Sequence, residues 1–320
     1  MATRALPDLD VQFRALREGA GFLDRTGRAT LELRGPDAAE YLQGQVTNDV
    51  LALAPLQGCY AAMLNPKGRI VADLRILRPE PERFALDTEA GALDAVLRDL
   101  RMYKIGRRVD LEETPERALV SLIGPRADEI AEGALGIRLP VDEHALAPVE
   151  RTAIAIRTAV GIDILVDEAR AGELRERIIA AGAQPVSVEA AEVLRIEHGR
   201  PRHGLDMTEE NFPAEVGIVE RAVSFTKGCY VGQETVARLH YKGKPNRSLR
   251  GLKLTAAVER GAPIVLGERE VGTVGSTCVS PAHGPIALAL VRREASPGDT
   301  VTVGPDSIEA AVIELPFERA

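Results

Sequence analysis

The sequence predicts an α+β protein in which two ferredoxin-like units enclose a ligand crevice and a small β-barrel follows at the C-terminus. Three observations support this prediction. A strand, turn and helix pattern at residues 30–43 returns at residues 119–129, which indicates an internal duplication of about 85 to 90 residues. Each copy continues in the strand and helix order of a ferredoxin-like unit. From Arg247 onward, short strands broken by glycines replace the helical pattern, as in small barrels.

The two copies share the same opening phrase. An alternating strand at 30–34 leads into Gly-Pro-Asp at 35–37, which begins a helix because proline is tolerated in a first helical turn. A strand at 119–123 leads in the same way into Gly-Pro-Arg at 124–126. Further strands are expected at 60–64, 70–77, 83–87, 107–111, 152–157, 161–166 and 185–188, and helices at 90–102 and 169–180.

After residue 188 the chain no longer follows the pattern of the two ferredoxin-like units. Residues 189–198 predict a short helix, with Ser187 as its N-cap and Gly199 as its stop. Six barrel strands are expected at 249–254, 263–266, 271–278, 286–291, 300–303 and 308–313. The predicted domains are a first α+β unit at 1–112, a second ferredoxin-like unit at 113–188, a connecting helix and motif segment at 189–246, and the barrel at 247–320.

Composition limits the classes of function. The 320 residues carry a formal net charge of −8, and the three cysteines at 59, 229 and 278 fit neither a disulfide framework nor a metal-binding pair. We therefore expect a reducing compartment. The start of the chain lacks the features of a secretion signal, and no apolar run approaches the roughly 20 residues of a membrane span. These features predict a cytoplasmic protein without membrane or direct nucleic-acid partners.

Known catalytic and cofactor motifs are missing from the sequence. It contains no glycine-rich dinucleotide or phosphate loop and no His-Glu-x-x-His zinc helix. Its five histidines are scattered, and three cysteines cannot complete a four-thiolate iron–sulfur site. We expect no metal bound to this chain, and any link to iron–sulfur clusters would be indirect.

The segment Lys-Gly-Cys-Tyr-Val-Gly-Gln-Glu at 227–234 is the predicted functional centre. Its two glycines allow a sharply shaped loop that runs into an element starting near Gln233. Cys229 is the candidate reactive residue, and Lys227 would lower the pKa of its thiol if the two came close. The alternative is that Cys229 is a small buried hydrophobic residue.

Cations gather around this segment although the protein is acidic overall. They are Lys227, Arg238, Lys242, Lys244, Arg247, Arg250 and Lys253. Such a band favours a small anionic ligand over a long nucleic acid, which would prefer a basic face overall. The alternative is an ordinary solvated charged face.

Two carboxylates are further candidates. Asp73 lies in the strand-like run at residues 70–75, so its side chain either faces solvent or is held there for a purpose. Glu197 lies near the end of the 189–198 helix, where it is either a surface residue paired with Arg195 or Arg200, or a carboxylate that binds a ligand.

The motif at 227–234 resembles that of the YgfZ-type folate-binding proteins. These are relatives of the glycine-cleavage T-protein, an aminomethyltransferase, and are linked to iron–sulfur cluster maintenance and tRNA modification. The stretches 42–49, 63–70 and 195–201 also resemble that family, in the same order. The resemblance covers most of the chain. It implies a T-protein-like three-domain arrangement, tetrahydrofolate or a one-carbon derivative as the cofactor, and iron–sulfur client proteins or assembly machinery as partners.

The resemblance also implies roles for individual residues. Glu197 matches the family's pterin-binding glutamate, whose carboxylate accepts two neighbouring hydrogen bonds from the ring. Asp73 lies where the aminomethyltransferases orient and protonate the folate ring nitrogens, although those enzymes typically have two adjacent acidic residues and this chain has Ala72 before Asp73. Lys227, with Arg238 as second choice, would reach the glutamate tail of the folate.

The expected function is therefore tetrahydrofolate binding in support of iron–sulfur cluster assembly or repair, with Cys229 supplying a thiol for redox or cluster-related chemistry. The first alternative is a folate-dependent aminomethyltransferase of the glycine cleavage system. The second alternative is a protein-interaction scaffold without enzymatic activity. The sequence is compatible with a protein that turns over a substrate and with one that only binds.

Overall fold

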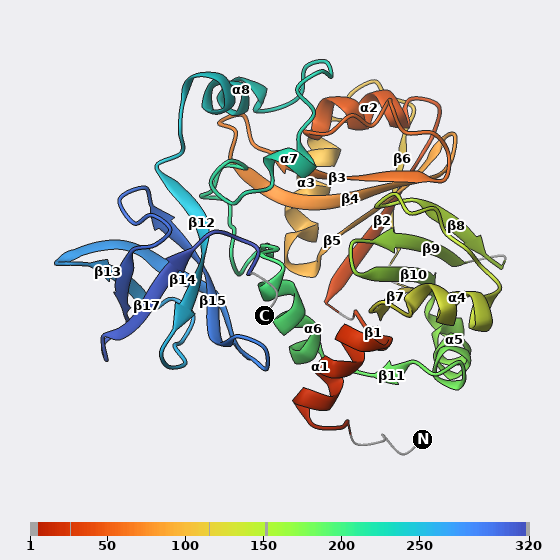
Figure 1. The fold of residues 1–320 in the computed structure, drawn as a ribbon. Coiled ribbons are helices and arrows are strands. Elements are labelled where there is room, and N and C mark those ends of the chain that lie inside the picture. The colour runs from red at the N-terminus through yellow and green to blue at the C-terminus, as the bar shows by residue number, and fades with distance from the viewer. Residues whose placement is uncertain (1–5, 26, 115, 151–152, 318–320) are drawn as a thin grey trace. The chain divides into compact units, whose positions relative to one another are not determined.

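The computed structural model describes residues 6–25, 27–114, 116–150 and 153–317 (Figure 1). These residues form two compact units. The two-sheet unit comprises the chain up to Met63 together with Ala72–Ala191 and Arg221–Val231. The barrel unit comprises Leu64–Val71, Glu192–Glu220 and the chain from Gly232 onward.

The first sheet of the two-sheet unit has five strands in the order β3-β4-β5-β2-β6. Its helices pack on it through one apolar face, as Val96, Leu97 and Leu100 do from α3. The elements are β2 (Arg28–Arg34), α2 (Ala38–Gln45), β3 (Gln57–Leu64), β4 (Ile70–Glu80), β5 (Arg83–Glu89), the 3₁₀ turn η1 (Ala90–Ala92), α3 (Leu93–Tyr103) and β6 (Asp110–Glu113).

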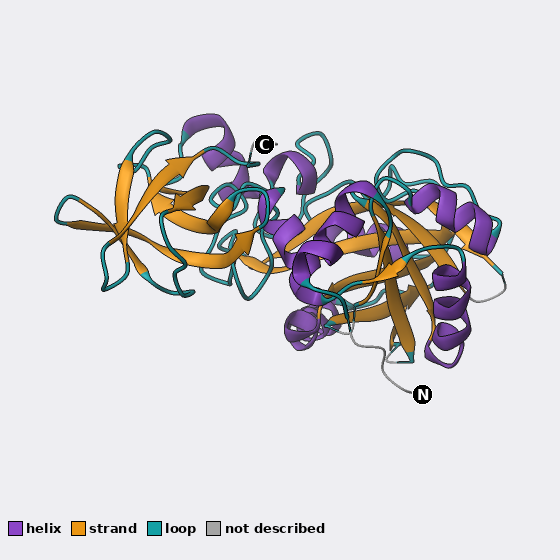
Figure 2. Cartoon of the chain, turned by 60° about the horizontal axis from the view of Figure 1, so that its bottom comes forward, coloured by secondary structure: helices purple, strands orange, loops and turns teal. Residues whose placement is uncertain are grey.

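The second sheet has six strands in the order β11-β1-β7-β10-β9-β8. Its elements are α1 (Leu9–Glu18), β1 (Gly21–Asp24), β7 (Arg117–Ile123), α4 (Ala127–Leu135), β8 (Leu146–Val149), β9 (Ala153–Thr158), β10 (Gly161–Asp167), α5 (Glu168–Ala180) and β11 (Gln184–Pro185). Figure 2 distinguishes the strands of both sheets from their helices.

The two sheets repeat one strand order, which explains the duplicated phrase in the sequence. β2 and β7 occupy matching places, and so do β5 and β10. The second sheet differs in one respect, because β1 lies between β7 and β11, antiparallel to the former and parallel to the latter. The predicted boundary at residue 112 assigns residues 21–24 to the first unit, whereas their strand pairs in the second sheet. Four residues whose partners lie far along the chain give no local signal.

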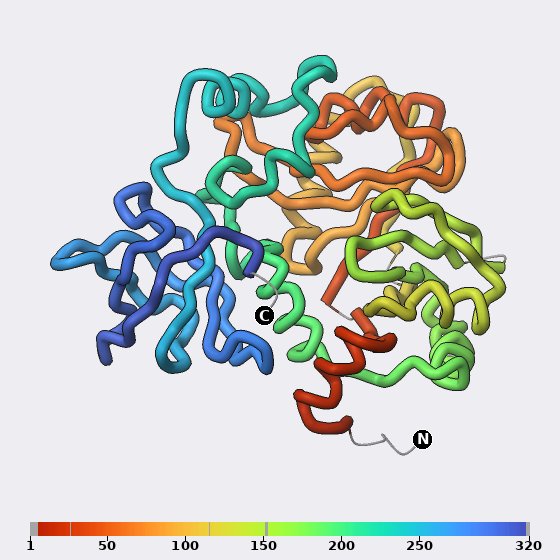
Figure 3. Tube along the Cα trace, viewed as in Figure 1, coloured from red at the N-terminus to blue at the C-terminus, as the bar shows by residue number. Residues whose placement is uncertain are grey.

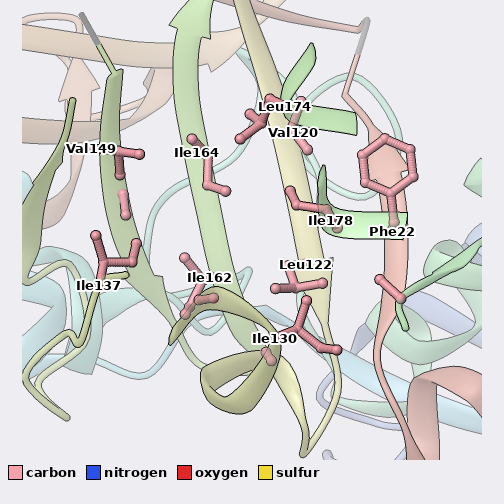
Figure 4. Close-up of a cluster of buried hydrophobic side chains, with 14 of the residues drawn as sticks. Phe22, Val120, Leu122, Ile130, Ile137, Val149, Ile162, Ile164, Leu174 and Ile178 are labelled. Carbon is pink, nitrogen blue, oxygen red and sulfur yellow. The ribbon is translucent and has the colours of Figure 1, made fainter. Parts of the chain in front are cut away.

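The core of the second sheet is mainly aliphatic and also contains the aromatic ring of Phe22 (Figure 4). Val120 and Leu122 of β7 and Ile164 of β10 point toward α5, which supplies Leu174 and Ile178. These side chains are buried, and the burial of each stabilises the folded state by about 1.5–3 kcal/mol. The sheet is therefore a firm support for polar side chains at its other face.

The barrel unit confirms the prediction of a small closed barrel. Its strands follow the order β12-β15-β14-β13-β16-β17 and close on themselves. They are β12 (Arg247–Leu254), β13 (Pro263–Leu266), β14 (Arg269–Ser280), β15 (Gly284–Arg292), β16 (Thr300–Val303) and β17 (Ile308–Ile313). Along the chain, three helices follow the last sheet strand and precede the first barrel strand: α6 (Val188–Glu197), α7 (Val219–Ala222) and α8 (Gln233–Lys242).

β14 is irregular at one point that matters for the polar residues. Its pairing with β15 shifts between Val274 and Thr277. A Cβ at Gly275 would lie 2.6 Å from an oxygen of Asp206, so only glycine lets this carboxylate approach the strand. None of the described helices is long and apolar enough to span a membrane.

Candidate functional site

The motif loop presents its cysteine to solvent. Cys229 and Gly228 are exposed, whereas the flanking Lys227 and Tyr230 are buried. Gly232 has a φ of +81° and forms the N-cap of α8, a left-handed conformation that favours glycine. The exposed thiol excludes the alternative that Cys229 is a buried hydrophobic residue.

Lys227 contacts backbone atoms instead of a ligand position. Its ammonium donates hydrogen bonds to the carbonyl oxygens of Gln43, Val46 and Asn48 at 2.7, 2.7 and 2.8 Å. Burial lowers the pKa of Lys227 to about 8, while the nearby charge of Asp49 raises it, so the ammonium is mostly protonated at neutral pH. All three N–H donors of the ammonium are thus used inside the protein. This placement does not match the predicted contact of Lys227 with a folate tail.

Lys227 was predicted to lower the pKa of the Cys229 thiol, but its charge acts on the thiol of Cys59. Cys59 is a half-buried residue of β3. Burial raises the pKa of its thiol to about 12, and the charge of Lys227 only partly opposes this. Cys59 therefore stays protonated at neutral pH, and its reactivity as a nucleophile is low.

Asp73 is held by a hydrogen bond within the two-sheet unit. It is a half-buried residue of β4, and the hydroxyl of Tyr60 on β3 donates to its carboxylate at 2.9 Å. Burial raises the pKa of Tyr60 well above its ordinary value, and the charge of Asp73 adds to this effect. Tyr60 is thus a permanent donor that fixes one carboxylate oxygen. The structure supports the reading that Asp73 is held in place, and not that it is a solvated strand residue.

A buried ion network that was not predicted from the sequence lies in the same unit. The guanidinium of Arg75 pairs with Asp87 of β5 and with Asp163 of β10, so it joins the two sheets. Arg28 pairs with the same Asp87, and the hydroxyl of Ser121 donates to Asp163. Burial alone would raise the pKa of Asp87, but Arg28 and Arg75 lower it below its ordinary value. The sequence signal was the presence of charged residues at buried strand positions.

His144 lies beside this network. It is 7% exposed and has a φ of +68°, a conformation that is uncommon for residues other than glycine. Burial and the charge of Arg75 together lower the pKa of His144 to about 4, although the charge of Glu143 opposes them. Arg221 and Asp163 are the other charged groups that act on the ring. His144 is therefore neutral in the folded protein at neutral pH.

This burial predicts a pH-dependent loss of stability. Below about pH 6.5 an unfolded histidine binds a proton. His144 resists protonation in the folded state until about pH 4, so the free energy of unfolding falls as the pH drops through this window. The loss from this residue is on the order of 3 kcal/mol. In His144→Asn, which tolerates a positive φ, urea unfolding at pH 7 and pH 4.5 should differ by less than in the wild type. Equal losses in the two proteins would contradict the prediction.

Glu197 is a buried carboxylate of the barrel unit. It ends α6, is 3% exposed, and accepts a hydrogen bond of 2.5 Å from the hydroxyl of Ser280 at the end of β14. Glu197 is buried, so the alternative that it is a surface glutamate is wrong. Arg195 forms ion pairs with Glu192 and Asp206. Burial raises the pKa of the nearby Cys278 to about 12, and the charge of Glu197 raises it too.

The predicted cationic band does not form one surface. Arg247 pairs with the buried Glu215, and Arg250 pairs with Glu314. Arg238, Lys242 and Lys244 are exposed at α8 and just after it, and make no ion pair within the described part of the chain. Arg238 remains available for a ligand, while Lys227 does not.

One polar cavity of ≈ 160 Å³ lies within the barrel unit. Asp206, Thr208, Asn211, Arg247 and Thr273 are among the residues that line it. None of the five predicted site residues lines this cavity. Across the described ranges, no group of three or more histidine, cysteine or acidic side chains is arranged to hold a metal ion.

Comparison with protein families shows which family this chain belongs to. Residues 5–227 match the GCVT N-terminal domain, and residues 247–318 match the glycine cleavage T-protein C-terminal barrel domain. The chain belongs to the glycine-cleavage T-protein family.

Individual members of the T-protein family match along nearly the whole chain. An aminomethyltransferase of Rubrobacter xylanophilus is 30% identical, over 97% of this chain and 86% of the relative. One of Corynebacterium aurimucosum is 31% identical, over 91% of this chain and 84% of the relative. The crystal structure of the glycine cleavage system aminomethyltransferase T from Bartonella henselae superposes with a TM-score of 0.89 at 24% identity, covering 97% of this chain and 89% of that one.

These matches confirm the predicted T-protein-like fold and the broader half of the resemblance. Membership of the T-protein family is established over both domains. The structure also separates the predicted site residues by unit. Asp73, Lys227 and Cys229 belong to the two-sheet unit, and Glu197 and Arg238 belong to the barrel unit. The contacts of Tyr60, Arg75 and Ser280 were not predicted from the sequence.

Proposed function

We propose that the protein binds tetrahydrofolate and acts as an aminomethyltransferase of the glycine cleavage type. The observation that carries this proposal is the hydrogen-bonded Tyr60–Asp73 pair, a carboxylate held in a fixed orientation in a chain whose relatives are aminomethyltransferases along nearly their full length. Tetrahydrofolate, when bound, supplies the ring nitrogens that take up the one-carbon unit.

Asp73 is the proposed acid and orienting group. Because Tyr60 already donates to one oxygen of the carboxylate, the side chain has little freedom to turn away from a substrate atom. A carboxylate in this state can accept a proton and return it at the same position, which is the requirement for general acid and base catalysis. Ala72 beside it contributes no second carboxylate, so this task would fall to Asp73 alone.

Glu197 is the proposed pterin ligand. A carboxylate offers about four acceptor sites, so the hydrogen bond from Ser280 is compatible with further bonds from the N–H groups of a ligand. Its burial means that such bonds would form away from water, where charge-assisted hydrogen bonds are strong. The remaining acceptor sites of the carboxylate therefore fit a ring that presents adjacent N–H groups. Arg238 is the proposed partner for the folate tail.

Two measurements test the proposal together. With an aminomethyl group on a lipoylated carrier protein, wild type should form methylene-tetrahydrofolate and release ammonia. By calorimetry, Glu197→Ala should bind tetrahydrofolate about 30-fold or more weakly, as expected when a buried charged hydrogen bond is removed. Glu209→Ala, an exposed residue, is the matched control. Equal affinities of wild type and Glu197→Ala would remove the pterin ligand from the proposal.

The exposed thiol of Cys229 favours a second candidate function. In this alternative the protein binds tetrahydrofolate as the YgfZ-type members do and supports iron–sulfur enzymes, including those that modify tRNA, without aminomethyl transfer. The support is the motif at 227–234 together with the solvent-facing position of its cysteine. Folate binding without turnover of the lipoylated carrier would favour this candidate.

A complementation experiment tests the second candidate directly. A deletion strain would carry wild type, Cys229→Ala or Cys278→Ala, and the readout would be the activity of iron–sulfur enzymes that modify tRNA. Cys229→Ala should fail to rescue, and Cys278→Ala should rescue, because burial raises the pKa of that thiol to about 12. Full rescue by Cys229→Ala would end this candidate. Absence of folate binding, with rescue intact in Glu197→Ala, would instead favour a scaffold role.

A further inference from the structure

We propose that Lys227 is a positioning residue that fastens the loop carrying Cys229 to the C-terminal end of α2, so that the thiol is presented at a fixed place. The inference rests on the proposed function for the use of the thiol, whereas its exchange and thiol readouts need no folate. It depends on contacts that all lie within the two-sheet unit.

The ammonium of Lys227 occupies a site made entirely of backbone oxygens. The three carbonyls of Gln43, Val46 and Asn48 each accept one of its N–H groups at 2.7 to 2.8 Å. A lysine ammonium has three donors and no acceptor, so this arrangement satisfies it completely. Lys227 is 8% exposed, and its charge is therefore directed inward.

The position of these carbonyls explains why a cation belongs there. Gln43 lies in the last turn of α2, and Val46 is the C-cap residue of the same helix. The last carbonyls of a helix have no partner within it, and the helix dipole places partial negative charge at this end. Lys227 thus supplies the cap that α2 lacks, because no basic residue occupies its last turn.

The cysteine is held from both sides. Lys227 precedes Cys229 by two residues, and Val231 follows it by two. The N–H of Val231 donates to the carbonyl of Gly44 at 3.2 Å. In sequence, Gly44 lies between Gln43 and Val46, which are two of the residues that accept from Lys227. The short arc from Gly228 to Tyr230 therefore spans two fixed points on the same helix end. In Figure 3, residues 43–48 and residues 227–231 are separate stretches of the trace, far apart in sequence.

The same helix end leads to the Tyr60–Asp73 pair. The side-chain amide of Asn48 donates to the backbone oxygens of Tyr60 at 2.8 Å and Arg221 at 3.1 Å. Tyr60 in turn donates to Asp73. Lys227 therefore stabilises a segment that contacts Tyr60, the hydrogen-bond partner of the proposed acid, and Val231, which follows the motif cysteine by two residues.

Substitution of Lys227 by alanine tests this role. The variant should keep the far-UV circular dichroism of the wild type. The amide hydrogens of residues 43–50 should exchange about tenfold faster or more, because a charged hydrogen-bonding group is lost. The exposed Cys229 should also react with a thiol reagent at a changed rate. Lys244→Ala, which removes an exposed lysine with no ion pair in the described chain, should change neither readout.

Chemical rescue separates positioning from general destabilisation. Lys227→Ala leaves three carbonyls around a space that had held an ammonium, so ammonium chloride should restore slow exchange at 43–50. Tetramethylammonium chloride at the same ionic strength should not, because it has no N–H donor. If Lys227→Ala does not fold, Lys227→Met, which keeps the apolar stem, is measured in its place.

The outcomes are distinct. Exchange and thiol reactivity equal to wild type in the variant would overturn the role of Lys227. Faster exchange that both salts restore equally would also overturn it, since the carbonyl site would then not be specific for a donor cation. A wild type that fails to bind tetrahydrofolate would refute the proposed function, yet the exchange and thiol readouts would still decide the role of Lys227.

Discussion

Replacing Asp73 with asparagine is expected to slow aminomethyl transfer by about 10²- to 10⁴-fold, the usual range for loss of a general acid or base. Asparagine keeps the shape of the side chain, and its amide oxygen still accepts the hydrogen bond from Tyr60. It cannot give or take a proton. Tetrahydrofolate affinity should therefore change little while the turnover number falls, as single-turnover kinetics would show.

Two companion variants define what Asp73 does. Tyr60→Phe keeps the ring and removes the hydroxyl donor, so it should cause a smaller loss of rate by loosening the carboxylate. Asp94→Asn, which changes an exposed carboxylate in the first turn of α3, should leave the rate unchanged. A normal turnover number in Asp73→Asn would remove Asp73 from the reaction.

Replacing Arg75 with methionine is expected to lower the free energy of unfolding by about 3–5 kcal/mol, the usual range when one partner of a buried ion pair is removed. Arg75 is the guanidinium that connects Asp87 with Asp163, and both carboxylates are at most 8% exposed. Asp87 keeps Arg28, but Asp163 loses its buried partner in the variant. Urea unfolding followed by circular dichroism would measure the difference.

The double variant Arg75→Met, Asp163→Asn checks the cause. If the loss comes from an uncompensated buried charge, neutralising Asp163 should recover part of the stability. Arg126→Ala removes an exposed arginine that pairs with Glu129, and should have little effect because solvent screens that pair. No recovery in the double variant would mean that lost packing of the arginine stem, and not charge, explains the result.

The sequence predicted those parts of the fold that have local signals. The repeated Gly-Pro turns marked both copies, because proline has the φ of a first helical turn and glycine permits the unusual backbone conformation just before it. The short barrel strands were marked in the same way by their glycines. β1 was missed because its four residues pair with strands near residues 120 and 184, and such distant pairing leaves no periodic pattern.

The candidate site was predictable only as far as side-chain type allows. Cys229, Asp73 and Glu197 were predicted as site residues from their side-chain chemistry and from the resemblance to a known family. The partners of Lys227 were not predictable, because they are backbone carbonyls as far as 184 residues away, and every residue type carries one. Arg75 was missed for a related reason, since its two carboxylate partners lie on different strands of two sheets.

The place of β1 between β7 and β11 constrains the order in which the nascent chain can assemble. Residues 21–24 leave the ribosome early, but their hydrogen-bonding partners at 120–123 and 184–185 emerge much later. Synthesis proceeds at about 5–20 residues per second, so about 5 to 30 seconds pass before the partners of this strand have been made. During that time its unpaired edge is open to other chains. Chaperone dependence should therefore be greatest before residue 185 is made, and a variant permuted to place this strand after β11 should fold with less assistance.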